Sequence, residues 1–141
     1  PDEAAERAML LATTGAPEAP PPQALTAAEL MAAQALIRRM PVGEKVLDAI
    51  LRLVRGARPE TASLSVVRES LAWGPGPRAA QALMLASRAR AVLDGRLSPS
   101  VDDVLALAEP VLRHRMALNF AARAEGAKLA DVIAALKADL G

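Results

Sequence analysis

The sequence contains no cysteine and a single histidine, His114. The lack of cysteine excludes disulfides, thiolate catalysis, cysteine-ligated zinc and iron–sulfur clusters. One histidine cannot form a multi-histidine metal site, and any Ser–His catalytic arrangement would depend on His114. The sequence also contains no P-loop, HExxH, GxSxG or EF-hand motif. We therefore predict no metal site and no self-sufficient active site.

Aromatic residues are almost absent, since Trp73 and Phe120 are the two in the chain. A composition rich in Ala, Leu and Val predicts closely packed helices, and the scarcity of rings argues against stacking on single-stranded nucleic acid. No stretch reaches about 18 apolar residues, and no signal-peptide pattern opens the chain. We expect a cytoplasmic protein without membrane association. Because the chain opens with Pro1, we expect it to be processed or cut from a longer protein.

Neither sign of charge dominates: 17 Lys and Arg oppose 16 Asp and Glu, for a net charge of +1. This balance gives no global electrostatic reason to bind nucleic acid or an anionic membrane. With 52% hydrophobic residues in 141, the chain can form one folded domain with a sizeable core.

The N-terminal part of the chain divides into a helix and a linker. Residues 3–13 predict a short helix. The following segment, 14–25, holds four prolines and a glycine, which predicts an extended linker. Thr26 and Glu29 form a capping box at the start of a helix that runs to about Met40. We place the end of the first unit at residue 14, the linker at 15–25 and the main domain at 26–141.

The main domain shows a series of helical patterns. Apolar residues recur at helical spacing over 42–57: Val46, Ile50, Leu53, Val54 and Ala57. A further stripe predicts a helix over about 77–94 that stops at Gly95: Ala79, Leu83, Ala86, Ala89 and Leu93. The region between them is ambiguous, and 64–72 fits a short strand or a helical turn.

Two more helical segments follow. Ser100 and Asp103 predict a helix start, with a helix to about Ala108 that Pro110 breaks or replaces by a new helix over 110–118. The last apolar stripe completes the pattern: Leu129, Val132, Ile133, Leu136 and Leu140. The fold class is therefore all-α, a helical bundle with a Pro-rich linker and a short separate N-terminal helix.

The segment from Gly74 to Ala79 looks like a glycine-rich phosphate loop, but Pro75 and Pro77 lack the amide hydrogens that such a loop uses. It fits a helix start instead, with Gly76 as N-cap, Pro77 at the first position and Arg78 in the first turn. Because a helix N-terminus favours negative charge, Arg78 is placed unfavourably unless an anion joins it. Arg78 is thus a candidate phosphate receptor; the alternative is a solvated arginine beside a turn.

Other polar and aromatic residues have structural interpretations. Arg52, Arg55 and Arg58 fit a solvated helix face, and the cluster Arg113, His114 and Arg115 fits C-terminal capping. Asp102 and Asp103 suit a helix first turn, and Trp73 is expected to be a core or linker anchor.

Several segments occur in a familiar order: LIRRMPV at 36–42, LVRGARP at 53–59, GPGPRA at 74–79, ARAVLDGR at 89–96, SVDDV at 100–104 and VLRHRMALN at 111–119. Over about 26–141 this arrangement resembles the C-terminal lid of the MoxR family of AAA+ ATPases, and 3–13 resembles the last helix of the ATPase core. The resemblance implies an all-α lid that closes over ATP bound to a P-loop core.

In that family a GASPRA motif carries the sensor-2 arginine, which reaches the γ-phosphate. The resemblance places Arg78 in this role, with Gly76 and Pro77 beside the cofactor, although Pro75 and Gly76 replace the motif's Ala and Ser. The implied parent is an ATP hydrolase that remodels client proteins. Its P-loop, its Mg²⁺-binding motif and its arginine finger belong to the core, so this fragment alone is expected to be inactive and to bind ATP weakly.

The resemblance implies several partners: the AAA+ core of the same chain, neighbouring subunits of a hexameric ring, and von Willebrand A-domain proteins. Whether Arg78 serves its own subunit's nucleotide or a neighbour's stays open. Two other hypotheses also stay open. One is a free-standing adaptor that binds a partner through an apolar groove, with docking of 126–141 as an amphipathic helix as one form of it. The other is a helix-turn-helix DNA binder that uses Arg52, Arg55 and Arg58, although the balanced charge counts against it.

Overall fold

The computed structural model of the chain describes residues 2–15 and 24–140, which cluster into two compact units, Pro1–Met31 and Ala32–Gly141. The first unit contains helix α1 (Glu3–Thr13), at the position predicted. Asp2 caps it by accepting a hydrogen bond of 2.8 Å from the amide of Ala5. Most of the predicted linker, 16–23, lies outside the described residues, and the boundaries at 14 and 25 stay predictions.

Helix α2 (Ala27–Arg39) begins with the predicted capping box. The amide of Thr26 donates to Glu29 Oε2 at 2.7 Å, and the amide of Glu29 donates to Thr26 Oγ1 at 3.2 Å. Both bonds satisfy amides that have no partner within the helix. The apolar side of α2, however, is not part of the core, because none of its described side chains is buried.

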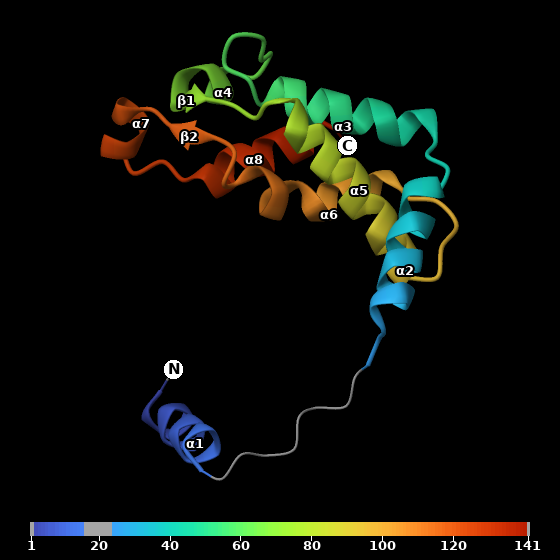
Figure 1. Ribbon diagram of the computed structural model, residues 1–141. Coiled ribbons are helices and arrows are strands. Elements are labelled where there is room, and N and C mark those ends of the chain that lie inside the picture. The colour runs from blue at the N-terminus through green and yellow to red at the C-terminus, as the bar shows by residue number, and fades with distance from the viewer. Residues whose placement is uncertain (1, 16–23, 141) are drawn as a thin grey trace. The chain divides into compact units, whose positions relative to one another are not determined.

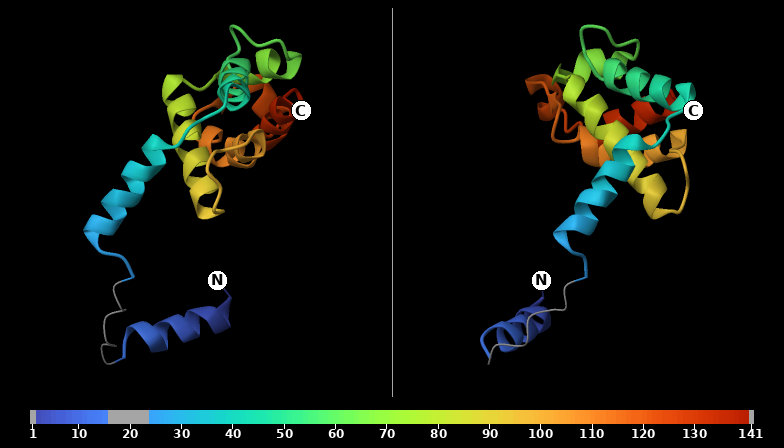
Figure 2. Two further views of the ribbon diagram at one scale, coloured as in Figure 1. Left: turned by 90° about the vertical axis from the view of Figure 1, so that its right-hand side faces the viewer. Right: turned by 45° about the vertical axis from the view of Figure 1, so that its right-hand side comes forward.

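The second unit is a bundle of helices, which confirms the all-α prediction (Figures 1 and 2). Its elements are α3 (Glu44–Gly56), α4 (Ser65–Ser70), β1 (Leu71–Trp73), α5 (Pro77–Leu93), α6 (Val101–Leu112), β2 (Ala117–Leu118), α7 (Phe120–Ala124) and α8 (Leu129–Ala138). Helix α5 packs against α3 and α6, and α8 packs against α6, α4 and α3. The elements α4, β1, β2 and α7 gather at one end of the bundle (Figure 1).

The apolar stripes of α3 and α8 form much of the core, as predicted. Val46, Ile50, Leu53 and Val54 of α3 are buried. Val132, Ile133 and Leu136 of α8 are buried as well. Burial of each such side chain stabilises the fold by about 1.5–3 kcal/mol. The C-terminal helix therefore completes the bundle.

The predicted buried face of α5 is only half right. Ala79 and Leu83 are buried, but the buried line continues through Ser87 and Ala91, whereas Leu93 is 87% exposed. The helix is apolar on several sides, so apolar periodicity alone does not show whether the buried residues are spaced by four positions or by a mixture of three and four. In the structure, the residues that lie against the neighbouring helices are spaced by four positions.

The predicted break at Pro110 is wrong, because α6 continues through Pro110 to Leu112. Pro110 has no N–H to donate to the carbonyl of Ala106, four residues earlier. Both residues are exposed, so this carbonyl lies on the solvent side. A helix over 110–118 is wrong too, since β2 pairs antiparallel with β1. The ambiguous segment 64–72 contains both of its alternatives, α4 followed by the start of β1. Strands of two or three residues are too short for alternation to be visible in a sequence.

Asp103 caps α6, as predicted, and also holds an ion cluster that the sequence analysis missed. Its Oδ2 accepts a bond of 2.8 Å from the amide of Ser100. Arg96 donates from Nη1 to Oδ2 at 2.8 Å and from Nη2 to Oδ1 at 2.7 Å, and Arg90 Nε lies 3.1 Å from Oδ1. Asp103 is only 2% exposed. The hydrogen bonds from Arg96 lower the pKa of Asp103 to about 2.

We expect Asp103→Asn to destabilise the chain by about 2 kcal/mol at pH 7, because charge-assisted hydrogen bonds lose their anion. A carboxylate with a lowered pKa stabilises the fold above its unfolded pKa of about 4, and this contribution is lost as pH falls towards 2. The difference between wild type and variant in urea denaturation should therefore shrink over that range. Asp102→Asn, in the same turn but exposed, is the matched control and should cost less than about 1 kcal/mol. Equal losses in the two variants would contradict this role of Asp103.

Candidate functional site

The loop before α5 is fixed against the end of α3. A Cβ atom on Gly74 would lie 2.1 Å from the carbonyl oxygen of Ala57 and 2.8 Å from Arg58 Cα, so only glycine fits there. Pro75 is fully buried, and its carbonyl accepts a hydrogen bond of 2.9 Å from Arg58 Nε. A close backbone approach and a charge-assisted bond thus hold two successive residues of this loop.

The loop leads directly into α5, with the helix start that the sequence predicts. Gly76 is the N-cap, with φ −82° and ψ −178°, and Pro77 occupies the first turn. No side chain caps this end. Arg78 follows and is exposed, and in the part of the chain that the structure describes its guanidinium makes no hydrogen bond or ion pair. An unpaired cation thus lies at the positive end of a long helix.

Arg78 faces a cleft of about 650 Å³, which is within the usual size of small-molecule sites. Three segments of the chain form its walls: β1 through Trp73, the loop and first turn of α5, and the turn after α6 through His114 and Arg115. None of the described residues that line it is acidic. The cleft therefore combines an exposed indole, a histidine and two arginines.

The meeting of Arg78 with His114 and Arg115 is a finding that the sequence analysis missed. The pairing of Trp73 with Ala117 across β1 and β2 brings the turn after α6 beside the start of α5. Trp73 is 51% exposed, so its prediction as a core anchor is wrong. Each strand is so short that no local pattern marks the pairing, which joins segments more than 40 residues apart.

The cluster Arg113–Arg115 divides into two parts. Arg115 donates from Nη1 to the carbonyl of Val111 at 2.6 Å, which confirms capping of the C-terminus of α6, and it also contacts His114 Nε2. Arg113 does not line the cleft and lies 3.9 Å from Glu109 Oε1, on the exposed side. Capping therefore fixes the position of Arg115 at the cleft wall.

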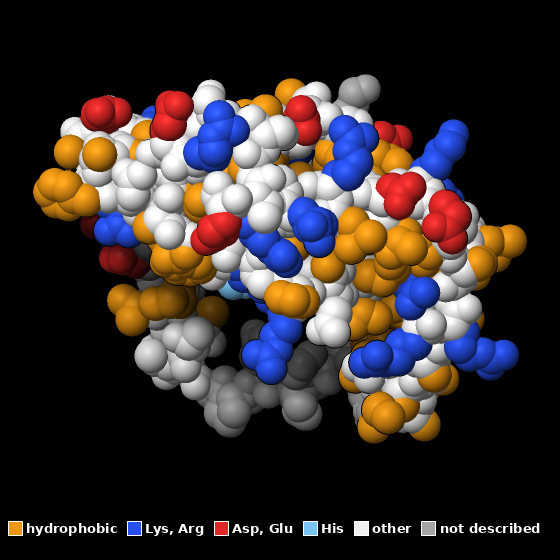
Figure 3. Space-filling model, turned by 90° about the horizontal axis from the view of Figure 1, so that it is seen from above, with side chains coloured by type: hydrophobic (Ala, Val, Ile, Leu, Met, Phe, Trp, Pro, Cys, Tyr) orange, Lys and Arg blue, Asp and Glu red, His pale blue; other side chains and the backbone are white. Residues whose placement is uncertain are grey.

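Of the three arginines predicted to form a solvated face, Arg52 and Arg55 are exposed, as predicted, and Arg58 is partly buried. Arg52 donates to the carbonyl of Asp139 at 2.8 Å, and Arg58, which lies beyond the end of α3, binds the loop before α5. On the face seen in Figure 3, Lys and Arg side chains lie among Asp and Glu side chains. The helix-turn-helix hypothesis therefore loses Arg58 from its set of arginines, because the Arg58 guanidinium binds the loop before α5.

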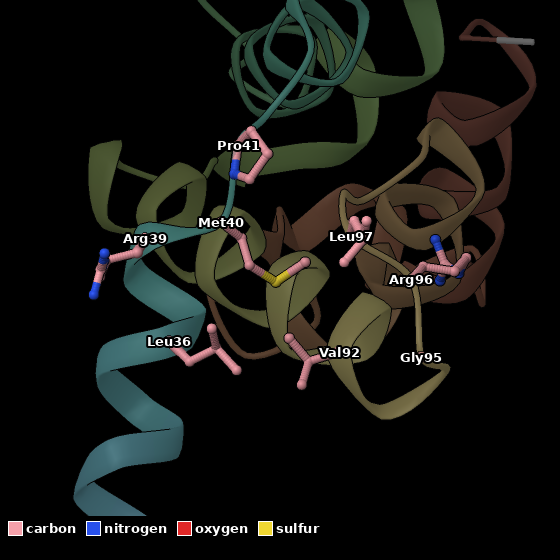
Figure 4. A pocket seen from close by; sticks show the side chains of 8 residues that line it. All are labelled: Leu36, Arg39, Met40, Pro41, Val92, Gly95, Arg96 and Leu97. Atoms are coloured by element: carbon pink, nitrogen blue, oxygen red, sulfur yellow. The ribbon is translucent and has the colours of Figure 1, made fainter.

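A second cleft, of about 660 Å³, lies between the end of α2 and the end of α5. Figure 4 shows Leu36 and Met40 on one side and Val92 and Leu97 on the other. Arg39 points away from it, and Arg96 turns towards its bonds with Asp103. This cleft is apolar and offers no polar group in a position to bind an anion.

The described residues contain no helix that is long and apolar enough to cross a membrane. Within the same ranges, 2–15 and 24–140, no three His, Cys, Asp or Glu side chains are grouped where they could hold a metal ion. The polar side chains that line the cleft at Arg78 are those of Arg78, His114 and Arg115, and its aromatic ring is Trp73.

We expect Gly74→Ala to destabilise the chain by about 1–3 kcal/mol, because the added methyl group collides with the Ala57 carbonyl and displaces the loop. Gly76→Ser is the matched control. Its Cβ enters open space, and its hydroxyl is a good N-cap, so stability should change by less than about 0.5 kcal/mol. Urea denaturation measures both. If the two variants were equally stable, the close approach at Gly74 would not be what holds the loop.

Comparison with known proteins places this geometry in a family. Residues 63–136 match the AAA lid domain. The chain is 32% identical over 109 residues to Chaperone MoxR1 of Mycobacterium tuberculosis, covering 74% of this chain and 29% of that protein. A crystal structure from Cytophaga hutchinsonii, of a protein assigned as an ATPase, matches with a TM-score of 0.68 and 27% identity over 72% of this chain and 31% of that one. The chain therefore spans less than a third of either relative. It belongs to the AAA lid domain family, as the lid of a MoxR-type AAA+ ATPase.

Proposed function

We propose that this chain is the lid of a longer ATPase, that it closes over ATP held by a P-loop core, and that Arg78 is the sensor-2 arginine that contacts the γ-phosphate. One observation carries the proposal: Arg78 is an unpaired cation in the first turn of α5, on a loop fixed by α3, and it faces an open cleft. Gly76 and Pro77 form the backbone beside the nucleotide.

The geometry suits charge stabilisation in phosphoryl transfer. The transferring phosphoryl group carries charge on its equatorial oxygens, and a guanidinium can bind two of them at once. Such stabilisation is effective when the cation is already in place, since the site then needs no reorganisation. Gly74 and Arg58 keep the start of α5 in one position relative to α3. The lid therefore presents Arg78 on a rigid support.

The remaining machinery lies in the core domain of the proposed parent. The sequence has no P-loop, and the described residues hold no group of three His, Cys, Asp or Glu side chains that could bind a metal ion, so the core of the parent would hold Mg²⁺. ATP hydrolysis is thus an activity of the whole protein. The parent remodels client proteins in the cytoplasm. Its lid contacts its own core and the neighbouring subunits of a hexameric ring. A von Willebrand A-domain protein is a further partner.

One form of the adaptor hypothesis depends on a free apolar face in the C-terminal helix. That face is occupied, because Val132, Ile133 and Leu136 are buried within the bundle. A partner that took this helix would have to compete with the core itself. We therefore prefer the lid over the adaptor.

In the full-length ATPase, Arg78→Ala should lower the rate of ATP turnover about 10- to 1,000-fold, because the transition state loses a prepositioned cation. Arg123→Ala is the control, since Arg123 is equally exposed but lies on α7 and does not line the cleft. Steady-state phosphate release measures both variants, and size-exclusion chromatography checks that each assembles as wild type does. Unchanged turnover in Arg78→Ala would show that Arg78 is not the sensor-2 arginine.

A further inference from the structure

Two pairs of arginines differ in the anion available to them among the described residues. Arg90 and Arg96 converge on the buried carboxylate of Asp103. Arg78 and Arg115 line the same cleft, and no described acidic residue lines it with them. Like charges that share a small cleft repel each other, and an anion between them removes that cost. The second pair therefore has the arrangement of a site whose anion comes from outside.

Arg115 is in a position to bind such an anion. Its Nη1 is committed to the Val111 carbonyl, which anchors the guanidinium at the end of α6. A guanidinium has five N–H donors, so this anchor and the contact with His114 leave donors over. Arg115 makes no ion pair with any residue that the structure describes. It is thus a prepositioned cation with unused donors, half-buried beside the cleft.

Two arginines on separate segments can span a chain of phosphates, whereas one arginine binds a single phosphate group. Arg78 enters the cleft from the first turn of α5, and Arg115 enters from the turn after α6. The pairing of β1 with β2 fixes these segments relative to each other. His114 adds a polar ring, and Trp73 adds an apolar wall.

We propose that Arg115 is a second phosphate-binding residue of the lid, and that Arg78 and Arg115 together bind the polyphosphate of a nucleoside triphosphate at two of its phosphate groups. The identification of the polyphosphate as that of a nucleotide rests on the proposed function. The two-arginine site itself rests on the cleft.

The test is a titration of the 141-residue chain with sodium tripolyphosphate and, separately, with orthophosphate at matched ionic strength. NMR follows the indole N–H of Trp73, the only tryptophan, together with the backbone amides of the loop and of Arg115. We expect tripolyphosphate to bind at least about tenfold more tightly than orthophosphate, because it reaches both arginines. Equal affinities for the two anions would overturn a two-arginine site.

Variants separate a local site from general charge. Arg115→Gln should weaken tripolyphosphate binding about tenfold, and Arg115→Lys should restore part of it. Arg123→Gln removes the same charge outside the cleft and should change the affinity less than about twofold. Arg115→Gln also removes the hydrogen bond to the Val111 carbonyl. Thermal melts of each variant check that a loss of affinity does not come from a loss of folded protein. If Arg115→Gln stayed folded and bound as wild type does, or if Arg123→Gln lost as much affinity, the proposal would be wrong.

ATP turnover distinguishes this proposal from the proposed function. In the full-length ATPase, Arg115→Gln should raise the KM for ATP about tenfold relative to Arg123→Gln. A loss of turnover in Arg78→Ala with an unchanged KM in Arg115→Gln would leave the sensor-2 role intact and refute the second phosphate-binding residue. An unchanged turnover in Arg78→Ala together with tight tripolyphosphate binding would refute the sensor-2 role and leave the phosphate-binding site intact.

Discussion

The close approach of Gly74 to the Ala57 carbonyl is the constraint on which the candidate site depends. It brings the chain between β1 and α5 into contact with the end of α3, at a distance that excludes any side chain. Arg58 then holds the next residue through the Pro75 carbonyl. Since α5 starts only two residues later, the direction of the helix and the position of Arg78 follow from these two contacts. A mutation at the end of α3 can therefore alter the cleft without touching it.

The small sheet has a comparable effect on the other wall. Its strands add Leu71 and Leu118 to the core, and the pairing of Trp73 with Ala117 brings the turn after α6 beside Arg78. Capping then fixes Arg115 within that turn, because its guanidinium binds the Val111 carbonyl. The same bond that ends α6 thus orients a cation towards the cleft. The hydrogen bond between Arg115 and the Val111 carbonyl thus both caps the helix and shapes the cleft.

These contacts also explain which features could be predicted from the sequence. The stripe of α3 and the start of α5 at Gly76 and Pro77 were predictable, because helical periodicity and capping depend on residues a few positions apart. The bond from Arg58 to Pro75 and the pairing of β1 with β2 join residues 17 and more than 40 positions apart. No local pattern encodes such pairs. Arg58 was therefore interpreted as solvated, and Trp73 as buried.

Arg78 was the exception, since a local conflict marked it as a candidate anion receptor before any tertiary contact was known. A cation at a helix N-terminus is unfavourable by about 0.3–1 kcal/mol in isolation. The structure supplies no described partner that would offset this cost, although the same chain places a buried Asp103 where Arg90 and Arg96 meet. Arg90 and Arg96 are thus paired with an acidic residue of the fold, whereas Arg78 and Arg115 make no ion pair with any described residue. Under the proposed function, an anion in the open cleft relieves the repulsion between Arg78 and Arg115, so we expect phosphate binding and closure of the lid to favour each other.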